Sequence, residues 1–183
     1  MYSLVIPIYN EQDVIISSLS ELFHTVYDVF VEIILIEDGS KDRTLSLIND
    51  FISDKAKFRL IIHEQNLGLS SAINTGSISV STKYFMYIDS DGQVDPSDIK
   101  KMVLFHKNNP NYHLISGIRV NRKDSFIKNI SSKIANLIRR TILKDTCLDN
   151  GCCIKLFERK SFLQLPFFIN YHRYFTTIYE RKG

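Results

Sequence analysis

Up to about Arg119, short runs of apolar residues alternate with stretches in which apolar residues recur every three or four positions. The runs are typical of strands buried on both faces, and they lie at Ser3–Ile8, Val31–Ile36, Phe58–His63, Tyr84–Ile88 and Leu114–Val120. The stretches between them predict helices near Glu11–Val26, Arg43–Ile52, Ser70–Val80 and Pro96–Lys107. We therefore expect successive βαβ units that build a Rossmann-like α/β fold with a doubly wound, mostly parallel sheet.

Two of the helices have recognisable starts. Pro96 follows Asp95, which is the order of a first-turn proline behind a capping residue, and Ser40 or Asp42 is placed to cap the second helix. Beyond about Arg119 the pattern changes, because apolar positions at helical spacing are interleaved with many Lys and Arg over residues 119–144. Such a segment fits either a helix lying against anionic lipid headgroups or an ordinary amphipathic helix with a solvated basic face.

Composition narrows the classes of function. A chain of 183 residues with 44% hydrophobic and 23% charged residues fits one globular domain, and a net charge of +3 gives no reason to expect nucleic-acid binding. The three cysteines have no zinc-site spacing, which fits a reducing compartment. The first residues lack the features of a secretory signal, and no apolar run approaches the roughly 20 residues that span a bilayer, so we expect a soluble or peripheral protein.

Polar residues follow each predicted strand, at the sheet edge where open parallel sheets bind ligands. In the loop after the fourth strand, Asp89 and Asp91 alternate with Ser90, so an extended backbone aims both carboxylates, or one of them with Gln93, at a single hard cation. Mg²⁺ or Mn²⁺ shared with substrate phosphates would suit this pair. Taken alone, the same residues also fit a simple turn after a strand.

The loop Glu37-Asp-Gly-Ser40 after the second strand is a candidate for nucleoside binding. Asp38 is suited to accept from a ribose hydroxyl or a base N–H, and Gly39 permits a tight turn. The chain has neither the glycine-rich dinucleotide fingerprint nor a P-loop, so dinucleotide and P-loop ATP chemistry lose support. A purely structural turn is the alternative for this tetrapeptide.

Taken together, the loop motifs resemble inverting glycosyltransferases of family 2, which have the GT-A fold. The motifs of the first half are Val5-Ile-Pro-Ile-Tyr-Asn-Glu11, Ile36-Glu-Asp-Gly-Ser-Lys-Asp-Arg-Thr44, Asn66-Leu-Gly-Leu-Ser-Ser-Ala72 with Gly76, and Asp89-Ser-Asp91 as the D-x-D metal motif. Those of the second half resemble the branch of dolichol-phosphate mannosyltransferases and undecaprenyl-phosphate glycosyltransferases, and they are Gly117-Ile-Arg119, Ser131-Ser-Lys133, Asp149-Asn-Gly151 and Lys155-Leu-Phe-Glu-Arg159. The resemblance covers nearly the whole chain.

The resemblance implies a role for particular residues. It implies metal ligands at Asp89, Asp91 and Gln93. It implies donor-nucleotide contacts at Pro7, Tyr9, Asn10, Glu11, Asp38, Ser40, Asn66, Gly68 and Asp89. It implies acceptor-phosphate contacts at Arg119, Ser132 and Lys133, with Asp91, Arg119 and Lys133 as the catalytic residues.

The reaction that the resemblance implies is metal-dependent transfer of a hexose from a UDP- or GDP-sugar to a polyprenyl phosphate at the cytosolic face of a membrane. A phosphate oxygen is already anionic, so orientation and charge neutralisation suffice without a strong base. The alternatives are transfer to a saccharide hydroxyl in polysaccharide synthesis, an inactive nucleotide-binding fragment and, from another class, a nucleotidyltransferase. The loop after the first strand is acidic, which argues against a nucleotidyltransferase.

Two departures from the family pattern qualify the resemblance. Glu37 stands where the branch usually has Asp, so a longer side chain is expected to shift the nucleoside slightly. The residues from His172 to Gly183 resemble the segment before the family's last strand and lipid-proximal loop, so the chain is expected to be truncated at its C-terminal end. We expect one catalytic domain over residues 1–183, with a donor and metal part at about 1–118 and an incomplete acceptor part at about 119–183. His172 and Arg173 fit either a surface turn or a part in closing the site.

Overall fold

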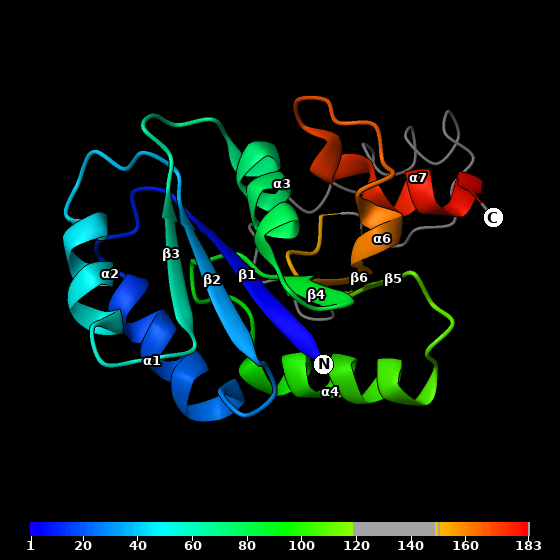
Figure 1. Ribbon diagram of the computed structural model, residues 1–183, viewed down its shortest axis with the longest axis horizontal. Helices are drawn as coiled ribbons and strands as arrows, with labels where there is room; N and C mark the ends of the chain where they lie inside the picture. The colour runs from blue at the N-terminus through cyan, green and yellow to red at the C-terminus, as the bar shows by residue number, and fades with distance from the viewer. Residues whose placement is uncertain (119–148, 150, 183) are drawn as a thin grey trace, which may run out of the picture.

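The computed structural model of the chain describes residues 1–118, 149 and 151–182. Its centre is a six-stranded sheet with the order β3-β2-β1-β4-β6-β5 (Figure 1). The strands are β1 (Tyr2–Ile8), β2 (Glu32–Glu37), β3 (Phe58–Ile62), β4 (Tyr84–Tyr87), β5 (Leu114–Ser116) and β6 (Lys155–Glu158). The first four pair in parallel, whereas β6 runs antiparallel to both β4 and β5. The expected α/β, mostly parallel sheet is confirmed.

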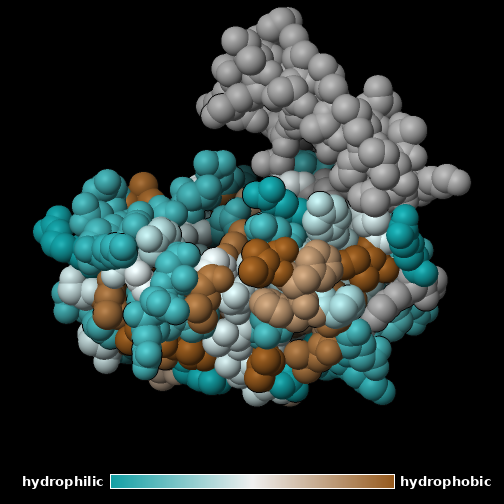
Figure 2. Space-filling view, turned by 90° about the horizontal axis from the view of Figure 1, so that it is seen from above, coloured by the Kyte–Doolittle hydropathy of each residue, from teal (hydrophilic) through white to brown (hydrophobic). Residues whose placement is uncertain are grey.

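Helices cover both faces of the sheet, as Figure 1 shows. They are α1 (Ile15–Val26), α2 (Thr44–Ile52), α3 (Leu69–Ser79), α4 (Pro96–Asn108), α6 (Arg159–Phe162), the 3-10 helix η1 (Tyr171–Tyr174) and α7 (Phe175–Lys182). Helices α1, α2 and α4 pack on one face, while α3, α6, η1 and α7 pack on the other. Among the described residues, none of these helices is long and apolar enough to cross a bilayer. Figure 2 shows apolar residues gathered in the middle of the face seen from above, beside hydrophilic ones.

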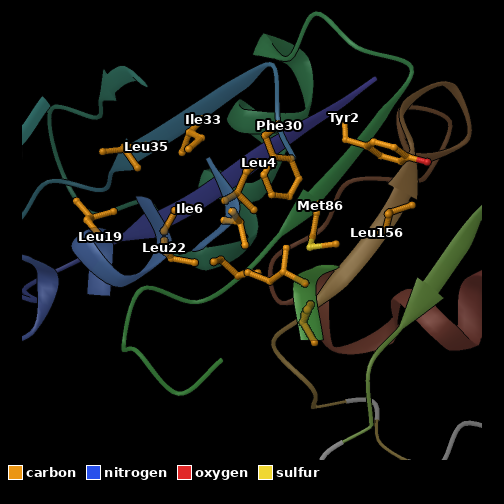
Figure 3. Close-up of a cluster of buried hydrophobic side chains, with 14 of the residues drawn as sticks. Tyr2, Leu4, Ile6, Leu19, Leu22, Phe30, Ile33, Leu35, Met86 and Leu156 are labelled. Atoms are coloured by element: carbon orange, nitrogen blue, oxygen red, sulfur yellow. The ribbon is translucent and has the colours of Figure 1, made fainter. Parts of the chain in front are cut away.

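Alternation along the strands divides the core into two layers. In β1, Leu4, Ile6 and Ile8 belong to the layer that also contains residues of α1 and α4. Figure 3 shows Leu4 and Ile6 of this layer together with Leu19 and Leu22 of α1. Val5 points the other way, toward α3. All residues of β1 and β2 are buried, as expected for central parallel strands. The edge strand β3 is only partly buried, so the expectation of burial on both faces is wrong for that strand.

Some predicted boundaries were wrong for local reasons. Helix α1 begins at Ile15 and not at Glu11, because Val14 has a non-helical backbone with φ of -123° and its N–H bonds to the Glu11 carbonyl in a turn before the helix. Strand β6 was not predicted at all. It has only two apolar residues between Lys155 and Glu158, and it pairs with strands that are distant in sequence.

The predicted cap of α4 is confirmed, since the Asp95 carboxylate accepts from the N–H of Ser97 at 2.8 Å beside Pro96. The second helix differs. Asp42 accepts from the N–H of Thr44 at 2.9 Å, at the start of α2, whereas the Ser40 hydroxyl bonds to the N–H of Asn10. Ser40 is therefore not the cap of α2, because a different loop occupies its oxygen.

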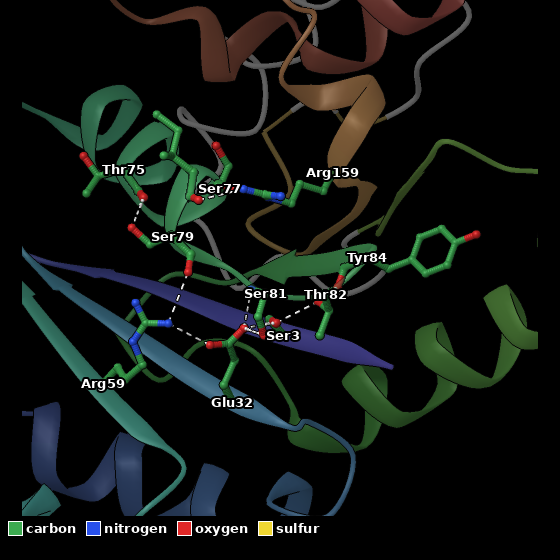
Figure 4. Close-up of polar contacts among 11 residues, drawn as sticks. Ser3, Glu32, Arg59, Thr75, Ser77, Ser79, Ser81, Thr82, Tyr84 and Arg159 are labelled. Atoms are coloured by element: carbon green, nitrogen blue, oxygen red, sulfur yellow. Dashed lines mark hydrogen bonds and ion pairs between the residues drawn. The ribbon is translucent and has the colours of Figure 1, made fainter.

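Glu32 anchors the sheet edge that carries the amino ends of the strands (Figure 4). Its carboxylate accepts from Ser3 Oγ at 2.7 Å, from Ser81 through both N–H and Oγ, and from Arg59 at 3.0 Å. Burial alone would raise the pKa of Glu32, but the hydrogen bonds from Ser81, Ser3 and Arg59 outweigh it and hold the pKa below its usual value.

Replacing Glu32 with Gln is expected to lower the free energy of unfolding by about 2 to 3 kcal/mol at neutral pH, because one amide group would face several donors. A lowered folded-state pKa contributes stability above the ordinary value of 4.5, and that stability is lost as the pH falls through the folded-state value. Urea unfolding of both proteins at neutral and acidic pH tests this. A difference in stability that does not shrink on acidification would contradict the charged role of Glu32.

Candidate functional site

A cavity of about 410 Å³ opens at the sheet edge that carries the carboxyl ends of β1, β2 and β4. It also receives the loop between β3 and α3 and the first turns of α3. Its wall is made by Pro7, Ile8, Tyr9, Glu11, Asp38, Asn66, Gly68, Leu69, Ala72, Asp89, Ser90 and Asp91. Parallel topology thus brings four separate loops to one place. Of the residues predicted for donor and metal binding, Pro7, Tyr9, Glu11, Asp38, Asn66, Gly68, Asp89 and Asp91 lie on this wall.

Asn10 and Ser40, also predicted for donor binding, do not line this cavity. Asn10 has a left-handed backbone with φ of 53°, its N–H donates to Ser40 Oγ at 2.9 Å, and its Oδ1 accepts from the N–H of Lys41 at 2.8 Å. The N–H of Glu11 donates to Thr44 Oγ1 at 2.8 Å. These bonds join the loop after β1 to the loop after β2, and Ser40 lines a neighbouring cavity of about 570 Å³.

Glu37 turns into its own loop. It is 1% exposed, and its carboxylate accepts from the N–H of Ser40 at 2.6 Å and from the N–H of Gly39 at 3.2 Å. The side chain thus supports the tight turn and does not line the 410 Å³ cavity, although it borders a neighbouring one of about 570 Å³. The longer side chain of Glu at this position accepts hydrogen bonds from backbone amides.

Gly39 allows two loops to touch. Its φ is +71°, and a Cβ atom there would lie 2.4 Å from the carbonyl carbon of Gln65 and 2.6 Å from the backbone nitrogen of Asn66. Gly68 is also left-handed, with φ of +85°, but a Cβ atom there would meet nothing within 4 Å. Gly39 therefore carries a steric requirement in addition to the conformational one that both glycines share.

Replacing Gly39 with Ala is expected to lower the free energy of unfolding by more than about 3 kcal/mol, because backbone strain and a backbone clash add together. Gly68→Ala is the control without a clash. Its φ of 85° with ψ of 159° lies in a region essentially confined to glycine, so strain alone is expected to cost about 1 to 3 kcal/mol. Urea unfolding measures both. Equal losses in the two variants would contradict the close approach of the two loops.

Asp38 is buried in the cavity wall and is held by three protein donors. Oδ1 accepts from the N–H of Leu67 at 3.0 Å and bonds to His63 Nδ1 at 2.6 Å, and Oδ2 accepts from the N–H of Gly68 at 2.8 Å. The carboxylate therefore fixes the loop between β3 and α3 against the end of β2. Sequence reasoning did not single out His63, since one polar residue after a strand has no distinctive spacing.

The acidic loop after β4 places Asp89 and Asp91 on the cavity wall. The N–H of Gln93 donates to Asp91 Oδ1 at 3.0 Å, and Gly92 between them has φ of +72°. The side chain of Gln93 is exposed and does not line the cavity. Among the described residues, no three His, Cys, Asp or Glu side chains gather as a preformed metal cage. Two carboxylates on one wall suit Mg²⁺ or Mn²⁺ that shares phosphate oxygens and water, so these residues fit such an ion.

Electrostatics at this wall are dominated by negative charge. The pKa of Glu11 is raised, first by burial and then by the nearby charges of Asp91 and Asp42. Three carboxylates from three different loops are thus close enough to interact. A divalent cation in the cavity would relieve this repulsion.

His172 lies beside the start of α3. Its Nδ1 bonds to Ser70 Oγ at 2.8 Å, which ties η1 to the helix whose first residues line the cavity. Burial lowers the pKa of His172 to about 4, with further contributions from Arg173 and Lys155, so the imidazole is neutral at neutral pH. Because the folded state binds this proton less readily than the unfolded state, the contribution of His172 to stability falls as the pH drops from 6.5 toward 4.

The remaining predicted site residues fall elsewhere. Arg119, Ser132 and Lys133 lie outside the described residues, as does the basic segment 119–144. Of the cysteines, Cys152 is free and buried in the core and Cys153 is free and partly buried. The predicted acceptor-phosphate contacts stay predictions.

Residues 3–165 match the family model of Glycosyl transferase family 2. An undecaprenyl-phosphate 4-deoxy-4-formamido-L-arabinose transferase of Pectobacterium atrosepticum is 30% identical over 161 residues, which are 86% of this chain and 48% of the relative. One of the same name from Yersinia pestis is 29% identical over 164 residues, again 86% of this chain and 48% of the relative. The chain spans about half the length of the curated relatives it matches.

Solved structures of glycosyltransferases share the fold. A mannosyltransferase from Pyrobaculum calidifontis in complex with GDP-Man and Mn²⁺ superposes with a TM-score of 0.64 at 17% identity, over 89% of this chain and 46% of that one. Glucosyl-3-phosphoglycerate synthase from Mycobacterium tuberculosis with Mn²⁺, UDP and phosphoglyceric acid superposes with a TM-score of 0.73 at 19% identity, over 91% and 58%.

Proposed function

The chain belongs to glycosyl transferase family 2, and on this premise we propose that it binds a UDP- or GDP-sugar in the 410 Å³ cavity and transfers the hexose, with inversion, to a polyprenyl phosphate. The observation that carries the proposal is the meeting of four loops at one wall, with Asp89 and Asp91 beside Glu11 and Asp38. Relatives named as undecaprenyl-phosphate transferases support the acceptor class.

Asp89 and Asp91 would hold Mg²⁺ or Mn²⁺ at the acidic wall. When bound, the ion supplies charge neutralisation for the diphosphate that leaves. The N–H of Gln93 keeps Asp91 oriented through its bond to Oδ1. Solved neighbours that contain Mn²⁺ support a divalent ion of this kind.

Asp38 and Tyr9 are proposed to bind the nucleoside. A carboxylate offers about four acceptor positions, and three at Asp38 are taken by His63, Leu67 and Gly68. One position on Oδ2 is left for a ribose hydroxyl or a base N–H. Tyr9 is 39% exposed on the same wall, so its ring is placed to contact the ligand.

The acceptor needs orientation more than activation. A phosphate monoester is anionic, so its oxygen attacks without a strong base once it is held in line with the anomeric carbon. Arg119, Ser132 and Lys133 are proposed to hold this phosphate. Arg119 and Lys133 are further proposed to act as catalytic residues with Asp91, by placing positive charge near the reacting phosphates.

Contact with a membrane is part of the proposal, because a polyprenyl chain is embedded in lipid. The segment before η1 exposes Phe167, Phe168 and Ile169 to 51%, 41% and 81%. Apolar side chains of this kind, in the segment that leads to η1 and its bond between His172 and Ser70 of α3, suit peripheral insertion into headgroups. We propose the cytosolic face of the membrane, because nucleotide sugars are the natural donors on that side.

Calorimetric titration with UDP and with GDP, with and without Mn²⁺, tests the donor site. We expect binding that requires the metal and that prefers one nucleotide. Transfer from the matching sugar nucleotide to undecaprenyl phosphate, followed by mass spectrometry of the lipid product, tests the acceptor. Binding of neither nucleotide would overturn the proposal, and transfer only to a saccharide hydroxyl would replace the acceptor.

A further inference from the structure

His63 is the first residue after β3, and its backbone continues the sheet. Its N–H donates to the carbonyl of Glu37 at 2.9 Å, which extends the pairing of β2 and β3 by one residue. The residue is 9% exposed, and its side chain lies between the end of β2 and the side of α3. The backbone of His63 is therefore fixed by the sheet, and its ring is held by contacts with Asp38 and Thr75.

Both ring nitrogens of His63 have a partner. Nδ1 lies 2.6 Å from Asp38 Oδ1, and Nε2 lies 2.9 Å from Thr75 Oγ1. An ionised carboxylate only accepts, so Nδ1 carries the proton and donates to Asp38. Nε2 is hydrogen-bonded to the Thr75 hydroxyl. A continuous chain Thr75–His63–Asp38 thus runs from α3 to the cavity wall.

We propose that His63 is a positioning residue for the donor nucleotide, an inference that rests on the proposed function. It fills one of the two acceptor positions of Asp38 Oδ1, while the N–H of Leu67 fills the other. Oδ2 accepts only from the N–H of Gly68, so it keeps one further acceptor position for a ligand in the cavity that Asp38 lines. His63 therefore determines which oxygen of Asp38 is offered to the ligand.

Thr75 fixes the plane of the imidazole. Without its hydroxyl, the ring keeps the bond to Asp38 but loses the second anchor that prevents rotation about its own axis. Thr75→Val keeps nearly the same shape and removes only that bond. Its effect on the ligand is expected to have the same sign as that of His63→Ala and to be smaller.

The test uses variants that replace one ring nitrogen at a time. The side-chain nitrogen of Asn lies close to the position of Nδ1, whereas that of Gln lies close to the position of Nε2. His63→Ala and His63→Gln are expected to weaken binding of UDP or GDP in the presence of Mn²⁺ about 10-fold, which is the effect of one lost hydrogen bond. His63→Asn is expected to restore affinity to within about 3-fold of the unaltered chain.

Glu32→Gln is the matched control, because it destabilises the chain from the opposite edge of the sheet. Thermal unfolding and nucleotide affinity are measured for each variant. Loss of affinity in His63→Ala and His63→Gln but not in Glu32→Gln, with recovery in His63→Asn, supports the positioning role. If the Asn and Gln variants bind alike, or if affinity follows stability in every variant, His63 is only a structural residue and the inference is overturned.

The outcome for the unaltered chain separates this inference from the proposed function. Metal-dependent binding by the unaltered chain together with unchanged affinity in the His63 variants overturns the inference and leaves the proposed function standing. Failure of the unaltered chain to bind UDP and GDP overturns both.

Discussion

Replacing Asp91 with Asn is expected to lower the affinity for UDP or GDP in the presence of Mn²⁺ by about 100-fold. Asp91 lies on the cavity wall with Asp89, and after burial its negative charge is the next cause of the raised pKa of Glu11. The amide of Asn keeps an oxygen that accepts from the N–H of Gln93, so the loop is expected to retain its shape. The free energy of unfolding should change by less than about 0.5 kcal/mol. Calorimetric titration measures the affinity and urea unfolding the stability.

Asp98→Asn is the matched control for this prediction. Asp98 is an exposed carboxylate on α4 that pairs with Lys101 at 2.7 Å and does not line the cavity. The Asp98→Asn substitution is expected to leave nucleotide affinity unchanged. Removal of the metal is expected to bring the unaltered chain and Asp91→Asn to the same weak affinity for the nucleotide. Metal-dependent binding that survives in Asp91→Asn would show that the ion is held elsewhere.

The central sheet was predictable because its strands are continuous apolar runs. Strands β1 and β2 are buried throughout, so nearly every residue carries the same hydrophobic signal. Strand β6 gave no such signal. Lys155 is 1% exposed there, and its ammonium group donates to the carbonyl of Cys152 and lies 5.7 Å from the ring centre of Tyr87. A buried cation with local partners looks like a surface residue in the sequence.

The location of the candidate site followed from topology, because residues after parallel strands converge at one edge. That reasoning placed Tyr9, Asp38 and Asp91 correctly on a common cavity wall. It did not distinguish side chains that face the cavity from those that hold the loops. Asn10 and Ser40 bond to one another's loops, a pairing that depends on backbone geometry that the sequence pattern does not encode.

Asp38→Asn is expected to lower the free energy of unfolding by about 3 kcal/mol and the melting temperature by roughly 6 to 12 °C. The carboxylate accepts from three protein donors, namely His63 and the N–H groups of Leu67 and Gly68. An Asn side chain has one acceptor oxygen, so its NH₂ group would face at least one N–H in a buried place. Thermal unfolding measures the loss, and Asp50→Asn, at an exposed position of α2, is the control that should change little.

Asp38→Asn should also reduce the gain in the free energy of unfolding that a bound ligand gives. A nucleoside diphosphate at about 100 times its dissociation constant stabilises the protein that binds it by about 2.7 kcal/mol. With Mn²⁺ present, the unaltered chain should show this gain in the free energy of unfolding. Asp38→Asn at the same ligand concentration should show less than half of that gain, because the free acceptor position on Oδ2 is lost or turned away. An equal gain in both proteins would mean that the ligand does not contact Asp38. Unchanged stability without ligand would mean that the three bonds do not hold the loop between β3 and α3.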